Sequence, residues 1–123
     1  MIKLFLLLSV TIIFISCDST TIQFNSTDWE ADRFGCNGIR EELLPEAEVI
    51  LPELLSENKK TVEAVFGRPD ITELNKRHLT NYLYFIEPRA QECKKSNNAK
   101  PTLAYCVEFN SLGRVSLISQ QLR

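Results

Sequence analysis

The sequence predicts an α+β fold in which two N-terminal helices pack on a three-stranded antiparallel sheet, in the order ααβββ. Apolar residues recur with helical spacing between residues 39 and 66. Near the C-terminus, residues 102–109 alternate between two faces in the way that is typical of a strand. A short turn that contains glycine separates the last two predicted strands. Helices followed by a run of strands are typical of an α+β domain with the helices on one sheet face.

The first helix is predicted over residues 39–51. Its apolar residues form a single stripe, at i, i+4, i+7 and i+8: Leu43, Ala47, Ile50 and Leu51. Four glutamates lie off this stripe and are expected to be solvated: Glu41, Glu42, Glu46 and Glu48. Pro45 must start a new helix or kink this one, and Pro52 is expected to bound it.

The second helix has clear signals at both ends. Asn58 is a favourable N-cap residue, and Gly67 stands where a helix often ends in a positive-φ residue. Pro69 follows two residues later, so the chain cannot continue as a helix. Between these signals lies a short apolar stripe: Val62, Val65 and Phe66.

Three strands are predicted after this helix, over residues 79–87, 102–109 and 114–122. The first is rich in residues that suit a pleated surface, such as Tyr82 and Tyr84. In the second, one face carries Leu103, Tyr105, Val107 and Phe109, and the other carries Ala104, Cys106 and Glu108. Gly113 in the following turn predicts an antiparallel return.

The N-terminus is typical of an export signal. Lys3 precedes an apolar run over residues 4–15, which is shorter than the roughly 20 residues that span a bilayer. Ser16 and Cys17 follow, in an arrangement that resembles the lipobox of bacterial lipoproteins. We therefore expect residues 1–16 to be a signal peptide, Cys17 to carry lipid, residues 17–27 to be a flexible tether and residues 28–123 to form one domain. A cleaved signal with a free cysteine nearby is the alternative.

Export makes a disulfide expected, because exported proteins fold in an oxidising compartment. Three cysteines remain beyond Cys17, and we favour a Cys36–Cys93 pair because both residues lie in predicted turns or loops. Cys106 lies in the middle of a predicted strand, where a buried free thiol is ordinary. The rival pairing is Cys93–Cys106. No metal or cofactor site is expected, since these cysteines and His78 lack ligand spacing.

Composition and motifs argue against two broad classes of function. The formal net charge is −2, and no basic stripe interleaved with aromatic residues suggests nucleic-acid binding. The only histidine, His78, lies in a charged run, and no glycine-rich phosphate loop is present. We therefore expect the protein not to be an enzyme.

Several short motifs resemble the SmpA/OmlA (BamE-like) envelope lipoproteins. They are the helix end Val65-Phe66-Gly67-Arg68-Pro69, the pair Tyr82 and Tyr84, and the hairpin Phe109-Asn110-Ser111-Leu112-Gly113-Arg114-Val115. The resemblance covers residues 58–117 and implies a lipid-anchored scaffold or accessory subunit of an envelope protein complex, expected at the outer membrane. Residues 29–40 lie outside that pattern and look more like uncharacterised envelope lipoproteins of the same ααβββ order.

The same fold is used by protein-inhibitor modules, so an independent protein- or ligand-binding module is the alternative function. Either function would use the open face of the sheet and the loop over residues 88–101. Three tyrosines suit an interface or the core equally well: Tyr82, Tyr84 and Tyr105.

Overall fold

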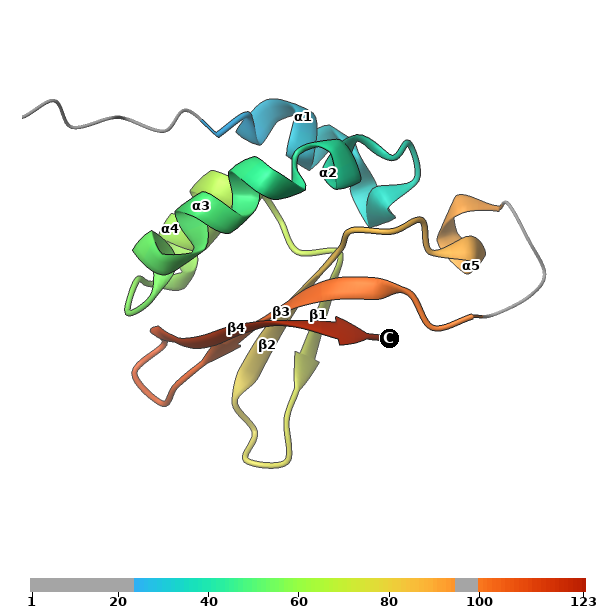
Figure 1. Ribbon diagram of the computed structural model, residues 1–123. Helices are drawn as coiled ribbons and strands as arrows, with labels where there is room; N and C mark the ends of the chain where they lie inside the picture. Colours follow the sequence, from blue (N-terminus) through green and yellow to red (C-terminus); the bar gives the residue numbers. More distant parts are fainter. Residues whose placement is uncertain (1–23, 95–99) are drawn as a thin grey trace, which may run out of the picture.

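The computed structural model describes residues 24–94 and 100–123. A layer of helices covers one face of a four-stranded antiparallel sheet whose strand order is β1-β2-β3-β4 (Figure 1). The strands are β1 (Ile71–Leu74), β2 (Thr80–Phe85), β3 (Leu103–Phe109) and β4 (Val115–Leu122). The α+β class is therefore confirmed, but the expected count of two helices and three strands is wrong.

The fold begins earlier than the sequence suggested. Helix α1 (Ser26–Ala31) starts inside the expected tether, and the Asn25 side chain caps it by accepting a hydrogen bond from the Asp28 N–H at 3.2 Å. The Phe24 ring packs against Trp29 at a centroid distance of 5.6 Å. Residues 24–27 therefore belong to the domain, because an aromatic anchor and a capped helix hold them.

The first predicted helix is divided at Leu43 into α2 (Ile39–Glu42) and α3 (Leu44–Leu54). Pro45 lies in the first turn of α3, where its missing N–H costs nothing. The expectation that Pro52 bounds this helix is wrong, since α3 continues through it to the buried Leu54. A proline in the last turn removes one hydrogen bond and leaves the rest of the helix intact.

Helix α4 (Lys59–Phe66) agrees with the prediction at both ends. The Asn58 side chain accepts a hydrogen bond from the Thr61 N–H at 2.9 Å, and Gly67 follows the helix with a φ of 75°. Val62 and Phe66 are buried on its inner face.

Strand β1 was not predicted from the sequence. It pairs antiparallel with β2, from Ile71 opposite Leu83 to Leu74 opposite Thr80. The turn between the two strands contains no glycine. Instead, the Asn75 side chain accepts hydrogen bonds from the N–H groups of Arg77 and Leu79, and His78 takes a positive φ of 59°.

The final hairpin is as predicted. Strands β3 and β4 pair from Leu103 opposite Leu122 to Phe109 opposite Val115, with a bulge near Phe109. Gly113 has a φ of 73° and donates its N–H to the Asn110 carbonyl.

The main core lies between the helices and the sheet face that they cover. Trp29 is fully buried there and packs against Phe66 with the rings tilted and their centroids 5.0 Å apart. The three tyrosines considered as interface anchors, Tyr82, Tyr84 and Tyr105, are buried in this core. They therefore contribute to packing rather than to an exposed surface.

Candidate binding surface

The ionisable residues inside the domain hold its N-terminal segment to the sheet. Arg40 of α2 is fully buried and pairs with Asp70, which lies immediately before β1. The Arg40 side chain also donates to the backbone carbonyls of Trp29 and Phe85, each at 3.0 Å. Asp70 accepts the Phe85 N–H at 2.8 Å. These groups are engaged with one another and with the backbone, so they act as a structural cluster.

Asp32 organises the turn that follows α1. It is fully buried and accepts hydrogen bonds from the N–H groups of Asn37 and Arg40, at 2.7 and 3.1 Å. Its carboxylate therefore helps to set the chain direction between α1 and α2.

A disulfide fastens the same turn to the segment after β2. The sulfur atoms of Cys36 and Cys93 are 2.05 Å apart and their Cα atoms are 5.3 Å apart. Cys93 ends the short helix α5 (Ala90–Cys93). The structure thus contains the pairing that the sequence favoured over Cys93–Cys106, and Cys106 is a buried free thiol.

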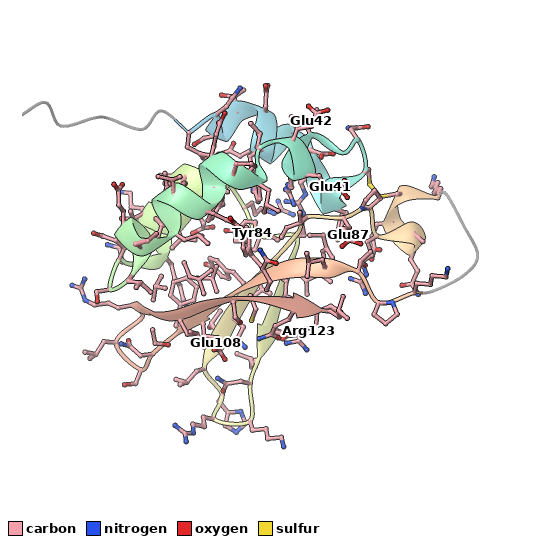
Figure 2. All side chains as sticks on the ribbon, viewed as in Figure 1. Glu41, Glu42, Tyr84, Glu87, Glu108 and Arg123 are labelled. Atoms are coloured by element: carbon pink, nitrogen blue, oxygen red, sulfur yellow. A yellow bond between two sulfur atoms is a disulfide. The ribbon has the colours of Figure 1, made fainter. Side chains whose placement is uncertain are left out.

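The sheet face turned away from the main helical layer is here called the open face. Its centre is a second apolar cluster of four buried residues: Leu83, Phe85, Ala104 and Cys106. Phe34, from the turn η1 (Arg33–Gly35), packs against Phe85 at a ring distance of 6.0 Å. Figure 2 shows Glu108 and Arg123 on this side of the sheet, whereas Tyr84 lies between the sheet and the helices.

An ion pair crosses the open face. Arg123, at the end of β4, pairs with Glu73 of β1 at 2.7 Å, although β1 and β4 are the two edges of the sheet. Both side chains are about one-third exposed, at 37% and 33%. The sheet is therefore twisted enough to bring its edges within reach of each other across this face.

The Cys106 thiol is buried within this face. Burial raises the pKa of the thiol, the Glu108 carboxylate raises it further, and Arg123 opposes the rise. Since the thiolate is the nucleophilic form, this environment makes Cys106 an unreactive core residue.

Two pockets border the open face, and basic residues line both. The larger, of about 540 Å³, lies between the β1–β2 turn and the β3–β4 hairpin; it is lined by Asn75, Lys76, Arg77, Leu79, Glu108, Phe109, Asn110 and Ser116. The smaller, of about 180 Å³, is lined by Arg89, Ala90, Gln91, Lys100, Pro101 and Arg123. Five basic side chains thus border this face. Two of them take part in ion pairs, Arg123 with Glu73 and Arg89 with Glu92, and Glu108 lines the larger pocket.

The other residues singled out in the sequence do not converge on a reactive centre. His78 is exposed in the β1–β2 turn, and the four glutamates of the first predicted helix are exposed. Within residues 24–94 and 100–123, no group of three or more histidine, cysteine or carboxylate side chains could hold a metal ion. Cys17 and the predicted signal peptide lie outside the described residues.

Sequence reasoning missed the buried Arg40–Asp70 pair and the basic border of the open face. Arg40 and Asp70 are 30 positions apart and follow no repeating pattern. The one available signal was Asp70 itself, a charged residue placed directly after the helix terminators Gly67 and Pro69.

Comparisons with known proteins leave the family open. No protein-family model matches this chain, and no curated protein or solved structure does so. In the described part of the chain, no helix has the length and apolar character needed to cross a membrane. The fold and surface therefore define a small, disulfide-linked α+β domain with one covered and one basic-bordered sheet face. The resemblance to SmpA/OmlA (BamE-like) lipoproteins stays a prediction.

Proposed function

We propose that the protein is a lipid-anchored, non-catalytic envelope lipoprotein that acts as a scaffold or accessory subunit of an envelope protein complex, in the manner of BamE-like proteins. The signal-like N-terminus followed by Ser16 and Cys17 supports the anchor. The glycine-ended helix α4 and the β3–β4 hairpin, whose turn contains Gly113, support the resemblance.

The observation that carries the binding role is the basic border of the open face. Lys76 and Arg77 are exposed at one end, and Arg89, Lys100 and Arg123 gather at the other. Complementary charge steers association and fixes orientation more than it adds affinity. A partner surface or segment that carries carboxylates suits this face, with contacts to the exposed Leu117 beside Glu108.

The proposal includes no catalytic role, because the buried ionisable groups already make structural contacts. Asp32, Arg40 and Asp70 are occupied by backbone and ion-pair contacts, and burial suppresses ionisation of Cys106. A general base or nucleophile needs a free partner in a cleft.

Affinity capture from detergent-solubilised membranes tests this function, with wild type compared with a Lys76→Glu/Arg77→Glu variant. The matched control is Lys60→Glu, an exposed lysine on α4 in the helical layer. We expect the same membrane partner with wild type and with the control, and its loss with the double variant. Equal capture by all three proteins would refute the role of this face.

The second candidate function is an independent, inhibitor-like binding module exposed from the membrane. The two pockets that border the open face favour it, because a concave site can bind a ligand or a segment of a soluble protein. In the same capture experiment this function predicts a soluble exported protein in the eluate rather than a membrane assembly partner.

A further inference from the structure

Among residues 24–94 and 100–123, no backbone group pairs with most of one edge of the sheet. Strand β4 is an edge strand, and Thr102 and Arg123 exchange both backbone hydrogen bonds, at 2.8 and 2.9 Å. Hydrogen-bonded and non-hydrogen-bonded pairs alternate along an antiparallel ladder. The N–H and C=O groups of Ile118, Gln120 and Leu122 therefore point away from β3.

Closer to its start, the same edge is already occupied. The Val115 N–H donates to the Glu57 carbonyl at 2.8 Å, and the Val115 carbonyl accepts from Ser56 at 2.9 Å. The loop between α3 and α4 thus covers the first residue of β4, and no other segment that the structure describes donates a backbone hydrogen bond to residues 118–122 on this edge.

The open stretch lacks the features that normally keep an edge strand from pairing. Such edges are usually short or carry charges, prolines or bulges. From Val115 to Leu122 the sequence is VSLISQQL, which contains neither a charged residue nor a proline. The bulge of this hairpin lies at the start of β4, opposite Phe109, and outside residues 118–122. The opposite edge, β1, is only four residues long and carries Glu73. The two edges therefore differ in the way expected if only β4 serves as a pairing surface.

We infer that β4 is the interface between two copies of this chain, joined edge to edge about a two-fold axis at Gln120. This interface goes beyond the proposed function and lies at the edge of the sheet, where Leu117 and Arg123 also border the open face. The symmetric register places Ile118 opposite Leu122 of the second copy, and Gln120 opposite its own equivalent. All outward backbone groups of residues 118, 120 and 122 then find partners.

The side chains suit a second copy because the pairing is self-complementary. Ile118 is partly buried and Leu122 is 66% exposed, so their pairing buries apolar surface twice in one dimer. Leu117 falls opposite Arg123, and Ser119 falls opposite Gln121, so no two like charges in the strands face each other. The Gln120 side-chain amide donates a hydrogen bond to Glu48 at 3.2 Å, so the two copies of Glu48 lie near the two-fold axis. Glu48 is exposed, and water and salt therefore screen the repulsion between the two carboxylates.

Cysteine cross-linking of the full-length chain in membranes tests the register directly. Residues opposite each other in a hydrogen-bonded pair have Cα atoms about 5.5 Å apart, within the range of about 4.4–6.8 Å that a disulfide spans. We expect Gln120→Cys to give a dimer on mild oxidation, with the link between the two introduced thiols identified by peptide mapping. Leu74→Cys, on the other edge, is the matched control and should remain monomeric.

A second measurement does not depend on the introduced thiols. Leu122→Lys should raise the dimer dissociation constant about tenfold in detergent micelles, because the lost apolar contact occurs twice in a symmetric interface. Leu74→Lys is the control, since Leu74 is 65% exposed on the other edge. Three outcomes would each overturn the inference: a monomeric wild type, equal cross-linking of both cysteine variants, or a link from the Gln120→Cys variant to a different protein.

Discussion

Gly35 is the residue at which backbone geometry and packing leave least freedom. It has a φ of 66°, and a Cβ atom placed there would lie 2.6 Å from the Ile86 carbonyl oxygen. Gly113 has a similar φ of 73°, but nothing lies within 4 Å of an added Cβ. A substitution at Gly113 therefore introduces backbone strain alone, whereas one at Gly35 introduces backbone strain and a steric collision.

We predict that Gly35→Ala destabilises the protein by more than Gly113→Ala does. Positive φ alone costs an L-residue about 1–2 kcal/mol. The collision with the backbone just after β2 should add about 1–3 kcal/mol at position 35. Urea denaturation of both variants measures the difference, and equal losses would show that the η1 turn does not press against this segment.

Two arginines contact Asp70, and they differ in burial. The Arg40 side chain is fully buried, whereas the Arg33 side chain is 38% exposed and lies 3.6 Å from the same carboxylate. Removing one partner of a buried pair leaves an uncompensated charge, which costs about 3–5 kcal/mol. An exposed pair contributes about 0–1 kcal/mol.

Arg40→Met should therefore lower the free energy of unfolding by about 3–5 kcal/mol, and Arg33→Met by less than about 1 kcal/mol. Both variants replace an arginine with methionine, and both arginines contact the same carboxylate, that of Asp70. Similar losses in the two variants, measured by chemical denaturation, would contradict the structural role assigned to the buried pair.

At the scale of elements, the disulfide ties the turn between α1 and α2 to helix α5. Cys36 and Cys93 are 57 positions apart, and closing a loop of that length stabilises a protein by about 4 kcal/mol in the chain-entropy description. The Arg89 N–H also donates to the Phe34 carbonyl at 3.2 Å, so a backbone hydrogen bond joins the same two segments beside the disulfide.

The melting temperature should fall clearly when the disulfide is reduced, or when Cys36 and Cys93 are both replaced with serine. The Cys106→Ser variant should still form the disulfide. Thiol counting and peptide mapping without reductant check the second part. A linked peptide that contains Cys106 would show that the cysteines pair differently from the structure.

The elements that the sequence predicted are those whose signals are local. Helix α4 carries its own cap and terminator, and the β3–β4 hairpin carries alternation and a glycine turn. Strand β1 escaped because it has four residues and its turn is built by the Asn75 side chain instead of glycine. Helix α1 escaped because a serine- and threonine-rich segment is also typical of a tether.

The open face could not be predicted because it depends on the whole topology. Glu73 and Arg123 are 50 positions apart and meet only because the sheet twists. The basic residues that border the face come from three separate segments, and the sequence showed them only as scattered surface charges. Periodicity assigns residues to faces within an element, whereas the convergence of segments requires the folded chain.

At the scale of the whole molecule, the buried tyrosines predict sensitivity to alkaline pH. Burial raises the pKa of Tyr105 to about 12, and burial also raises the pKa of Tyr84. In the unfolded chain these phenols lose their protons near pH 10, so above that pH the unfolded state binds fewer protons than the folded state. Stability from these groups is therefore fully present below about pH 10 and is lost as the pH rises towards 12.

Urea denaturation at a series of pH values, followed together with tyrosinate absorbance, measures this loss. We expect the buried tyrosines to titrate only as the protein unfolds. Ionisation of all three tyrosines near pH 10 in a protein that stays folded would contradict their placement in the core.

The central claim is that Cys17 anchors this domain to a membrane as a lipoprotein, and labelling with radioactive palmitate tests it most directly. Wild type and Cys17→Ala are expressed from the full-length sequence in a bacterium that processes lipoproteins, and the protein is recovered from the membrane fraction. We expect strong labelling of wild type and none of Cys17→Ala. Equal labelling of the two proteins, or no labelling of wild type, would contradict it.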